Sequence, residues 1–337
     1  MTSVLKLPHL WRTLKEADLA AIRRDAERRF EVLVVSADGS EAATLAALMT
    51  GAGRAHPWLT VSTPEEVRDR SVAAGLDAAI LVSGAEDLAS PLASAGAALR
   101  KAGVPLVTVV HGASTATGAI VRAGEAGRVA VPALDAEALP AIAEAVAAAF
   151  DPALRLALAR QLPPLRAAIF TALIDEAAKA NATYALTTGL AEVVPVLDVP
   201  LNLADMVVLT KNQLVMSYKI ALACGKKGEP RELIGEVMGV IGSGFLFRQA
   251  ARQLVGLIPV AGIVPKVAMA YAGTWAVGRA VAAWAAEGRR LTPAAVRRFY
   301  REAWGRGKTV AKAMAAQAGK VRPKRSWFRR KKPTPRD

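Results

Sequence analysis

Cysteine and histidine are scarce in this chain. The 337 residues include one cysteine, Cys224, and three widely separated histidines, His9, His56 and His111. A single thiol can form neither an intramolecular disulfide framework nor a thiolate zinc site, and the histidines lack the spacing of a zinc or catalytic motif. We therefore expect no bound metal, no cofactor and no histidine-based catalysis, and a reducing compartment.

Acidic residues are few in the second half of the chain. Residues 1–150 contain 14 Lys and Arg against 17 Asp and Glu, whereas residues 151–337 contain 30 against 12. The formal net charge is therefore −3 in the first part and +18 in the second. The length suits two domains, and this asymmetry indicates that the second one meets an anionic surface, either a membrane leaflet or a nucleic acid.

Short apolar stretches alternate with helical patterns in the first half. Strands are predicted at 30–36, 58–62, 77–83, 104–110 and 128–131. Helices are predicted at 41–50, from Pro64, at 90–102 and from Asp135 to Phe150, and residues 1–29 are predicted to form an amphipathic lead-in helix. Continuously apolar strands that alternate with helices indicate an α/β domain with a mostly parallel sheet covered on both faces.

This order of elements resembles the Ras-like GTPase domain, in particular the Era and TrmE type, over roughly residues 30–150. The resemblance implies a phosphate loop of the form G-x-x-x-x-G-K-[ST] after the first strand. The degenerate phosphate-loop positions of this chain are Gly39, Ser40, Glu41, Ala42 and Ala43. They lack the lysine and the hydroxyl that bind phosphate and magnesium, and a carboxylate at a helix N-terminus repels a triphosphate.

The other nucleotide motifs of that family are also missing. The chain has no D-x-x-G motif, and His111-Gly112-Ala113-Ser114 follows the strand 104–110, where the resemblance implies a guanine-reading N-K-x-D tetrad. We take His111 and Ser114 as degenerate base-recognition positions and expect a GTPase layout without GTP hydrolysis. Both stretches also fit an ordinary strand–helix turn and an ordinary loop.

Helical patterns replace the strands after Asp151. Helices are predicted at 152–162 and 165–190, on either side of Pro163-Pro164. A pattern of two prolines followed by an apolar run then occurs twice, with Pro195 and Pro200 before a run to Gly225, and Pro259 and Pro265 before a run to Gly288. Because proline interrupts a helix, each copy predicts a helical hairpin.

This helical part is similar to the module called domain of unknown function 697, which follows GTPase-like domains in bacterial membrane-associated proteins. The similarity covers about residues 168–313 and lies in the segments 195–200, 205–218, 242–244, 258–262 and 274–279. It implies a helical, membrane-associated module, and it supplies no catalytic residue.

The apolar module raises the question of membrane contact. A spanning helix needs about 20 mostly apolar residues, and Pro259 and Pro265 divide the stretch between Arg252 and Arg279 into shorter pieces. A re-entrant hairpin, an interfacial helix pair, a span that includes Lys266 and a soluble bundle of wholly apolar helices are all compatible with this pattern. The candidates for membrane contact in the module are Val260, Lys266 and Trp275.

The C-terminal end combines cations with aromatic rings. A helix is predicted at 294–304, and residues 319–337 are predicted to be a disordered basic tail. The membrane-contact candidates in this tail are Trp327, Phe328, Arg329, Arg330, Lys331 and Lys332. Each cation near an anionic leaflet contributes about 1 kcal/mol, and aromatic rings sit among headgroups. The same mixture also suits single-stranded nucleic acid, and a tail that only aids solubility is the third alternative.

These patterns divide the chain into a lead-in helix (1–29), a degenerate GTPase-like α/β domain (30–150), an all-α helical module with two proline-turned hairpins (151–318) and a basic tail (319–337). We expect a non-catalytic binding or scaffold protein at the cytoplasmic face of a bacterial inner membrane, with the cytoplasm as the alternative location. Its expected partners are an anionic membrane surface and either a protein or a second copy of the chain. The alternatives are a divergent GTP-dependent switch at the membrane and a nucleic-acid-binding protein that uses the tail.

Overall fold

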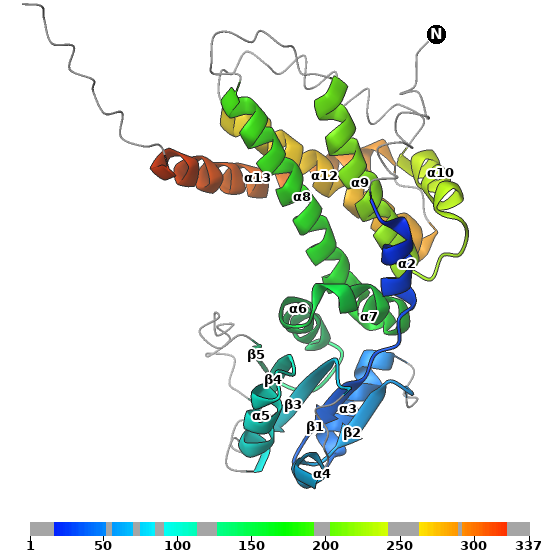
Figure 1. Ribbon diagram of the computed structural model, residues 1–337, viewed down its shortest axis with the longest axis vertical. Helices are drawn as coiled ribbons and strands as arrows, with labels where there is room; N and C mark the ends of the chain where they lie inside the picture. Colours follow the sequence, from blue (N-terminus) through cyan, green and yellow to red (C-terminus); the bar gives the residue numbers. More distant parts are fainter. Residues whose placement is uncertain are drawn as a thin grey trace, which may run out of the picture.

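The computed structural model describes residues 17–51, 56–69, 75–84, 91–112, 127–191, 203–241, 263–288 and 292–321. A sheet with its helices forms one end of the molecule, and a group of helices forms the other (Figure 1). The long helix α8 (Arg166–Ala191) runs from the sheet end into the helical end (Figure 1).

The sheet contains five parallel strands in the order β2-β1-β3-β4-β5. They are β1 (Val32–Val35), β2 (Leu59–Ser62), β3 (Ala78–Gly84), β4 (Leu106–His111) and β5 (Arg128–Val131). Val32 of β1 lies opposite Leu59 on one side and Ala78 on the other. The predicted α/β domain with a parallel sheet is therefore confirmed. From β1 the chain first adds β2 on one side and then β3 on the other, so the strand order reverses between β1 and β3. Open α/β sheets form their ligand crevices at this point.

Helices cover both faces of the sheet. One face packs against α3 (Ser40–Thr50) and α6 (Leu139–Ala149), and the other packs against α4 (Pro64–Asp69) and α5 (Pro91–Lys101). Val34 and Ile80 point to the first face, whereas Leu33 and Leu81 point to the second. Because each strand is buried on both sides, its sequence is apolar at consecutive positions and does not alternate.

The start of α6 differs from the prediction. A helix directly after Asp135 is wrong, because α6 begins at Leu139. Asp135 Oδ1 accepts hydrogen bonds from the backbone N–H groups of Glu137 at 2.9 Å and Ala138 at 3.0 Å. The aspartate therefore stabilises a separate turn before the helix, which is the other common role of this residue type.

The second half of the described chain is helical. After the 3₁₀ turn η2 (Pro152–Leu154) it contains α7 (Arg155–Gln161), the 3₁₀ turn η3 (Pro163–Leu165), α8, α9 (Leu203–Ala223), α10 (Pro230–Ile241), α12 (Ile263–Glu287) and α13 (Pro293–Val321). Helix α2 (Leu19–Glu27), within the predicted lead-in helix, packs against α7 and α9. The glycines predicted to end two helices, Gly225 and Gly288, have φ values of 81° and 68°. The predicted proline turns at 195–200 and 259 lie outside the described residues.

Helices α12 and α13 each differ from the sequence pattern at one end. Pro265 lies in the first turn of α12, where a backbone N–H has no acceptor within the helix, so this proline does not divide the helix. Helix α13 continues past the predicted end at Trp304 to Val321, and so enters the segment predicted as tail. A Cβ atom at Gly307 would lie 2.8 Å from the carbonyl oxygen of Ala268, which shows how closely α13 approaches α12.

A buried polar network connects α8, α9 and α12. Asn181 is fully buried, and its Nδ2 donates to Thr274 Oγ1 at 2.8 Å and to the carbonyl oxygen of Leu209 at 3.2 Å. Its Oδ1 accepts from Asn212 Nδ2 at 2.8 Å. Gln213 Nε2 donates to the same Thr274 hydroxyl at 3.2 Å. These bonds connect three helices, and Tyr271 Oη of α12 separately donates to Asp175 Oδ1 of α8 at 2.6 Å.

One apolar core runs through both ends of the molecule. Leu162 and Leu165, which flank the prolines of η3, are completely buried. The turn η3 packs against α3 and α6, and a Cβ atom at Gly51 would lie 2.9 Å from Cγ of Pro164. The helical end therefore covers the outer side of the two helices that themselves cover the sheet.

Candidate functional site

The turn between β1 and α3 is where the GTPase resemblance implies a phosphate loop. Gly39 has a φ of 81°, a left-handed conformation that glycine adopts without strain, and Ser40 begins α3. Asp38 Oδ1 accepts from Ser40 N at 2.9 Å and from Ser40 Oγ at 2.7 Å. Hydrogen bonds from this hydroxyl and this N–H lower the pKa of Asp38, so its carboxylate is ionised at neutral pH.

The N–H groups of Ser40, Ala42 and Ala43 at the start of α3 have acceptors within the protein. Ala42 N donates to Ser36 Oγ at 3.0 Å, and Ala43 N donates to the carbonyl oxygen of Gly39 at 2.9 Å. A phosphate loop leaves such N–H groups open to the anion. Here they are occupied, and the carboxylates of Asp38 and Glu41 stand at the same helix end.

The structure brings two predicted site residues together. His111 Nε2 lies 2.6 Å from Glu41 Oε1, although the residues are 70 positions apart. His111 lies on the same face of β4 as Val107 and Val109, which is the face covered by α3. The positions that the resemblance assigned to phosphate and to base are therefore bonded to each other. Ser114, the other base-recognition position, lies outside the described residues.

Ser83 is a polar residue at this edge that the sequence patterns did not single out. It is 2% exposed at the end of β3, and its Oγ has no hydrogen-bond partner within the described ranges. It shares a strand face with Ala79 and Leu81, which pack toward α5. Ser83 therefore lies on the opposite face from the Glu41–His111 pair. Within the described ranges, no three potential metal-ligating side chains come together.

Helix α13 has a row of exposed cations along one face. Ala303, Gly307 and Ala311 form its buried side. The exposed side includes Arg297, Arg301, Lys308 and Lys312, which we call the cationic stripe. Their spacing places them along one face of the helix over about 22 Å, at 1.5 Å per residue. Among the described residues, none of the four forms an ion pair with an acid.

The carboxylate of Glu302 in α13 forms its ion pair outside the cationic stripe. Glu302 is the single acidic residue between Pro293 and Val321. Its carboxylate lies 3.9 Å from Nε of Arg298, which is one turn before it. The stripe therefore keeps its positive charge.

The membrane-contact candidates of the module have different surroundings. Trp275 is 6% exposed and stacks on Tyr271 with ring centroids 6.0 Å apart. The guanidinium of Arg306 lies 4.9 Å from its ring centre, so the ring is enclosed between α12 and α13. Lys266 is half-buried in the first turn of α12. Val260 and the tail candidates at 327–332 lie outside the described residues.

A helix that crosses a membrane must be both long and apolar. None of those within the described ranges combines the length and the apolar character that crossing a bilayer needs.

Comparisons with known proteins identify no relative of this chain. A scan against protein-family models, a search of curated proteins and a search of solved structures each find no match. The resemblances to a Ras-like GTPase and to domain of unknown function 697 therefore stay predictions. The function of the chain has to be inferred from its own geometry.

Proposed function

We propose that this protein is a non-catalytic adaptor that attaches peripherally to an anionic membrane surface. The observation that supports this function is the cationic stripe on α13, which is exposed and unopposed along one face of a helix. The basic tail follows directly, so both would contact the same surface. A protein partner or a second copy of the chain would then be held at that membrane by the rest of the molecule.

The size of the stripe fits a flat anionic surface. A cation close to an anionic leaflet contributes about 1 kcal/mol, and this attraction fades over a Debye length of about 8 Å at physiological ionic strength. Cations along one face of a straight helix can all lie within this distance of a plane. Half-buried Trp304, near Arg301 and stacked on Tyr300 with centroids 6.0 Å apart, places an aromatic ring beside the stripe.

The sheet end supports the non-catalytic part of the proposal. The N–H groups of Ser40, Ala42 and Ala43 have internal acceptors, and the Glu41 carboxylate contacts His111. Such a turn offers a nucleotide phosphate two carboxylates and few free donors. The proposal includes a GTPase-like layout for the sheet end. Flavodoxin-like sheets have the same strand order, so the order alone does not distinguish these two folds.

Vesicle co-sedimentation of the full chain tests this function. The vesicles are phosphatidylcholine, with or without phosphatidylglycerol, at low and at high salt. Replacing Arg297, Arg301 and Lys308 together with Gln should weaken binding to the anionic vesicles on the order of 100-fold, at about 1 kcal/mol for each charge. The matched control replaces exposed Arg29, Arg100 and Lys101 with Gln, and it should change binding less than about threefold.

The outcomes separate the alternatives. Equal losses in both triple variants, or binding to neutral vesicles that salt does not weaken, would refute attachment through α13. If the α13 variant loses binding to single-stranded RNA and keeps vesicle binding, the nucleic-acid function is correct instead. Magnesium-dependent GTP binding by the full chain, measured by calorimetry, would support the GTP-dependent switch.

A further inference from the structure

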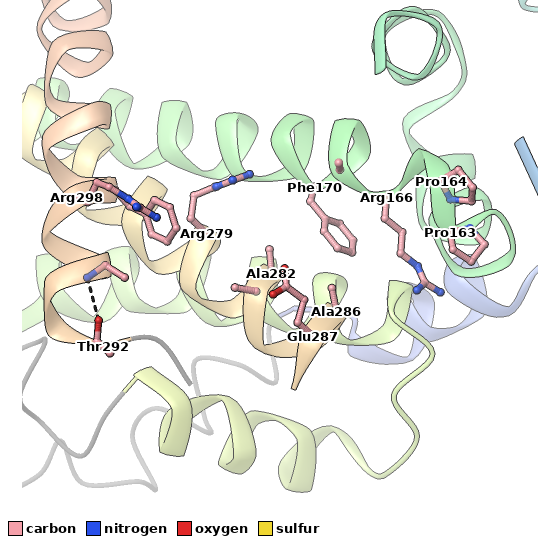
Figure 2. A pocket seen from close by; sticks show the side chains of 14 residues that line it. Pro163, Pro164, Arg166, Phe170, Arg279, Ala282, Ala286, Glu287, Thr292 and Arg298 are labelled. Carbon is pink, nitrogen blue, oxygen red and sulfur yellow. Dashed lines mark hydrogen bonds between the residues drawn. The ribbon is translucent and has the colours of Figure 1, made fainter. Parts of the chain in front are cut away.

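A groove of about 630 Å³ lies between the start of α8, the second half of α12 and the start of α13. Figure 2 shows its lining, with Arg166 and Phe170 toward one end and Arg279 and Arg298 toward the other. Its arginines come from three separate helices, and the acid among the lining residues is Glu287. This volume lies within the usual range of small-molecule sites, about 300–1,000 Å³.

Two of these arginines share one aromatic ring. The guanidinium carbon of Arg279 lies 5.5 Å from the ring centre of Phe299, and that of Arg298 lies 5.4 Å from it. Arg279 is half-buried and has no acidic partner among the described residues. Arg298 is exposed and lies 3.9 Å from the Glu302 carboxylate. Arg279 is partly removed from water without a counter-charge, which is unfavourable, so an anion is stabilised beside it.

Arg166 and the end of α13 add to the same positive field. Arg166 Nε donates to the carbonyl oxygen of Ala159 at 2.7 Å, and its Nη2 donates to that of Arg160 at 3.3 Å, so the side chain is fixed without an acid. Thr292 and Ala295 place the N-terminus of α13 at the groove, where Ala295 N donates weakly to Thr292 Oγ1 at 3.3 Å (Figure 2). The N-terminus of this long helix has a partial positive charge.

The remainder of the lining is apolar. Phe170 is 4% exposed beneath the groove, and Ala282 and Ala286 of α12 lie beside it. A ligand that fits this lining has an anionic head and an apolar body. Arginine forks match the oxygens of a phosphate in pairs, and two such forks at a helix N-terminus suit a group with several oxygens.

We propose that this groove binds a phosphate ester with an apolar substituent. The phosphate lies between Arg279 and Arg298 at the start of α13, and the apolar substituent lies along Phe170 and the alanines of α12. The ester is either a phospholipid headgroup or a soluble phosphate monoester. The site is separate from the cationic stripe, and it does not depend on the membrane attachment proposed above.

Calorimetry on the full chain tests the proposal with four probes: inorganic phosphate, phenyl phosphate, phenol and monomeric dihexanoyl phosphatidic acid. At least one ester should bind more tightly than inorganic phosphate by about tenfold or more, because its substituent buries apolar surface. Binding of the lipid alone identifies a headgroup site, and binding of both esters identifies a site that also accepts soluble esters. Phenol that binds as well as phenyl phosphate, or no binding of either ester, refutes the proposal.

Variants connect the binding to the arginines. Arg279→Gln should weaken ester binding on the order of tenfold or more, whereas Arg297→Gln, which removes the same charge from the stripe, should change it less than about twofold. Glu287→Gln should strengthen it. If Arg279→Gln fails to fold by circular dichroism, the exposed Arg298→Gln replaces it in the comparison. Equal losses from the groove variant and Arg297→Gln would show that only long-range charge matters, which refutes the site.

Discussion

Replacing Thr274 with Val tests whether the buried polar network stabilises the helical end. Valine has nearly the same shape as threonine, so the change leaves packing in place and removes one hydroxyl. That hydroxyl accepts from Asn181 Nδ2 at 2.8 Å and from Gln213 Nε2 at 3.2 Å. Both donors would lose this acceptor inside the helix bundle, where water cannot readily replace it.

The expected loss follows from these two donors. An unsatisfied buried donor costs about 1–3 kcal/mol. Asn181 is fully buried, but its amide keeps a second bond to the carbonyl oxygen of Leu209 at 3.2 Å. Gln213 is only half-buried, so its share lies at the lower end. We expect Thr274→Val to lower the free energy of unfolding by about 2–4 kcal/mol.

Urea denaturation followed by tryptophan fluorescence measures this change, since Trp275 is the neighbouring residue in α12. The matched control is Thr171→Val in α8, because the Thr171 hydroxyl donates only to the carbonyl oxygen of Ala167 in its own helix at 2.9 Å. The control should change the unfolding free energy by less than about 0.5 kcal/mol. If both variants unfold at the same urea concentration, the network does not stabilise the bundle and the reasoning is wrong.

Two further predictions concern α12 and α13. Gly307→Ala should destabilise the protein by about 1–3 kcal/mol, because its Cβ would lie 2.8 Å from the Ala268 carbonyl oxygen, whereas Gly305→Ala, which meets open space, should stabilise it by about 0.5–1 kcal/mol. Equal shifts in a urea titration would contradict the close contact. Burial and the hydrogen bond to Asp175 raise the pKa of the Tyr271 phenol. The unfolded chain therefore loses this proton first, above about pH 10, and the stability of the fold decreases as the pH rises further. In alkaline denaturation, Tyr271→Phe should make this decrease shallower. A decrease as steep as in the unsubstituted protein would contradict the reasoning.

The sheet was predictable because its strands have a local signal. Consecutive apolar residues such as Val32–Val35 indicate burial on both faces, and this required no knowledge of the partner strands. The end of α13 had a misleading local signal instead. Gly305 and Gly307 follow Trp304 and suggest that the helix stops, but the contact of Gly307 with α12 is available only to a residue without a side chain. Tertiary packing outweighed the low helix propensity of glycine.

The candidate sites were less predictable than the fold. The turn at Glu41 and the strand end at His111 were singled out separately, but their bond depends on β4 lying two strands from β1, which no local pattern indicates. The groove is harder still, because Arg166, Arg279 and Arg298 are ordinary helix residues in the sequence. They become a group only when α8, α12 and α13 pack together.

The core that passes through Leu162 and Leu165 has a consequence for how this chain can be divided. A fragment that ends at Phe150 would leave the outer sides of α3 and α6 in water, and a fragment that begins at Asp151 would expose the leucines that cover them. The two ends should therefore melt together in one cooperative transition. We therefore expect neither half to be a portable module, and an exchange of the sheet end between proteins would have to bring η3 and the start of α8 with it.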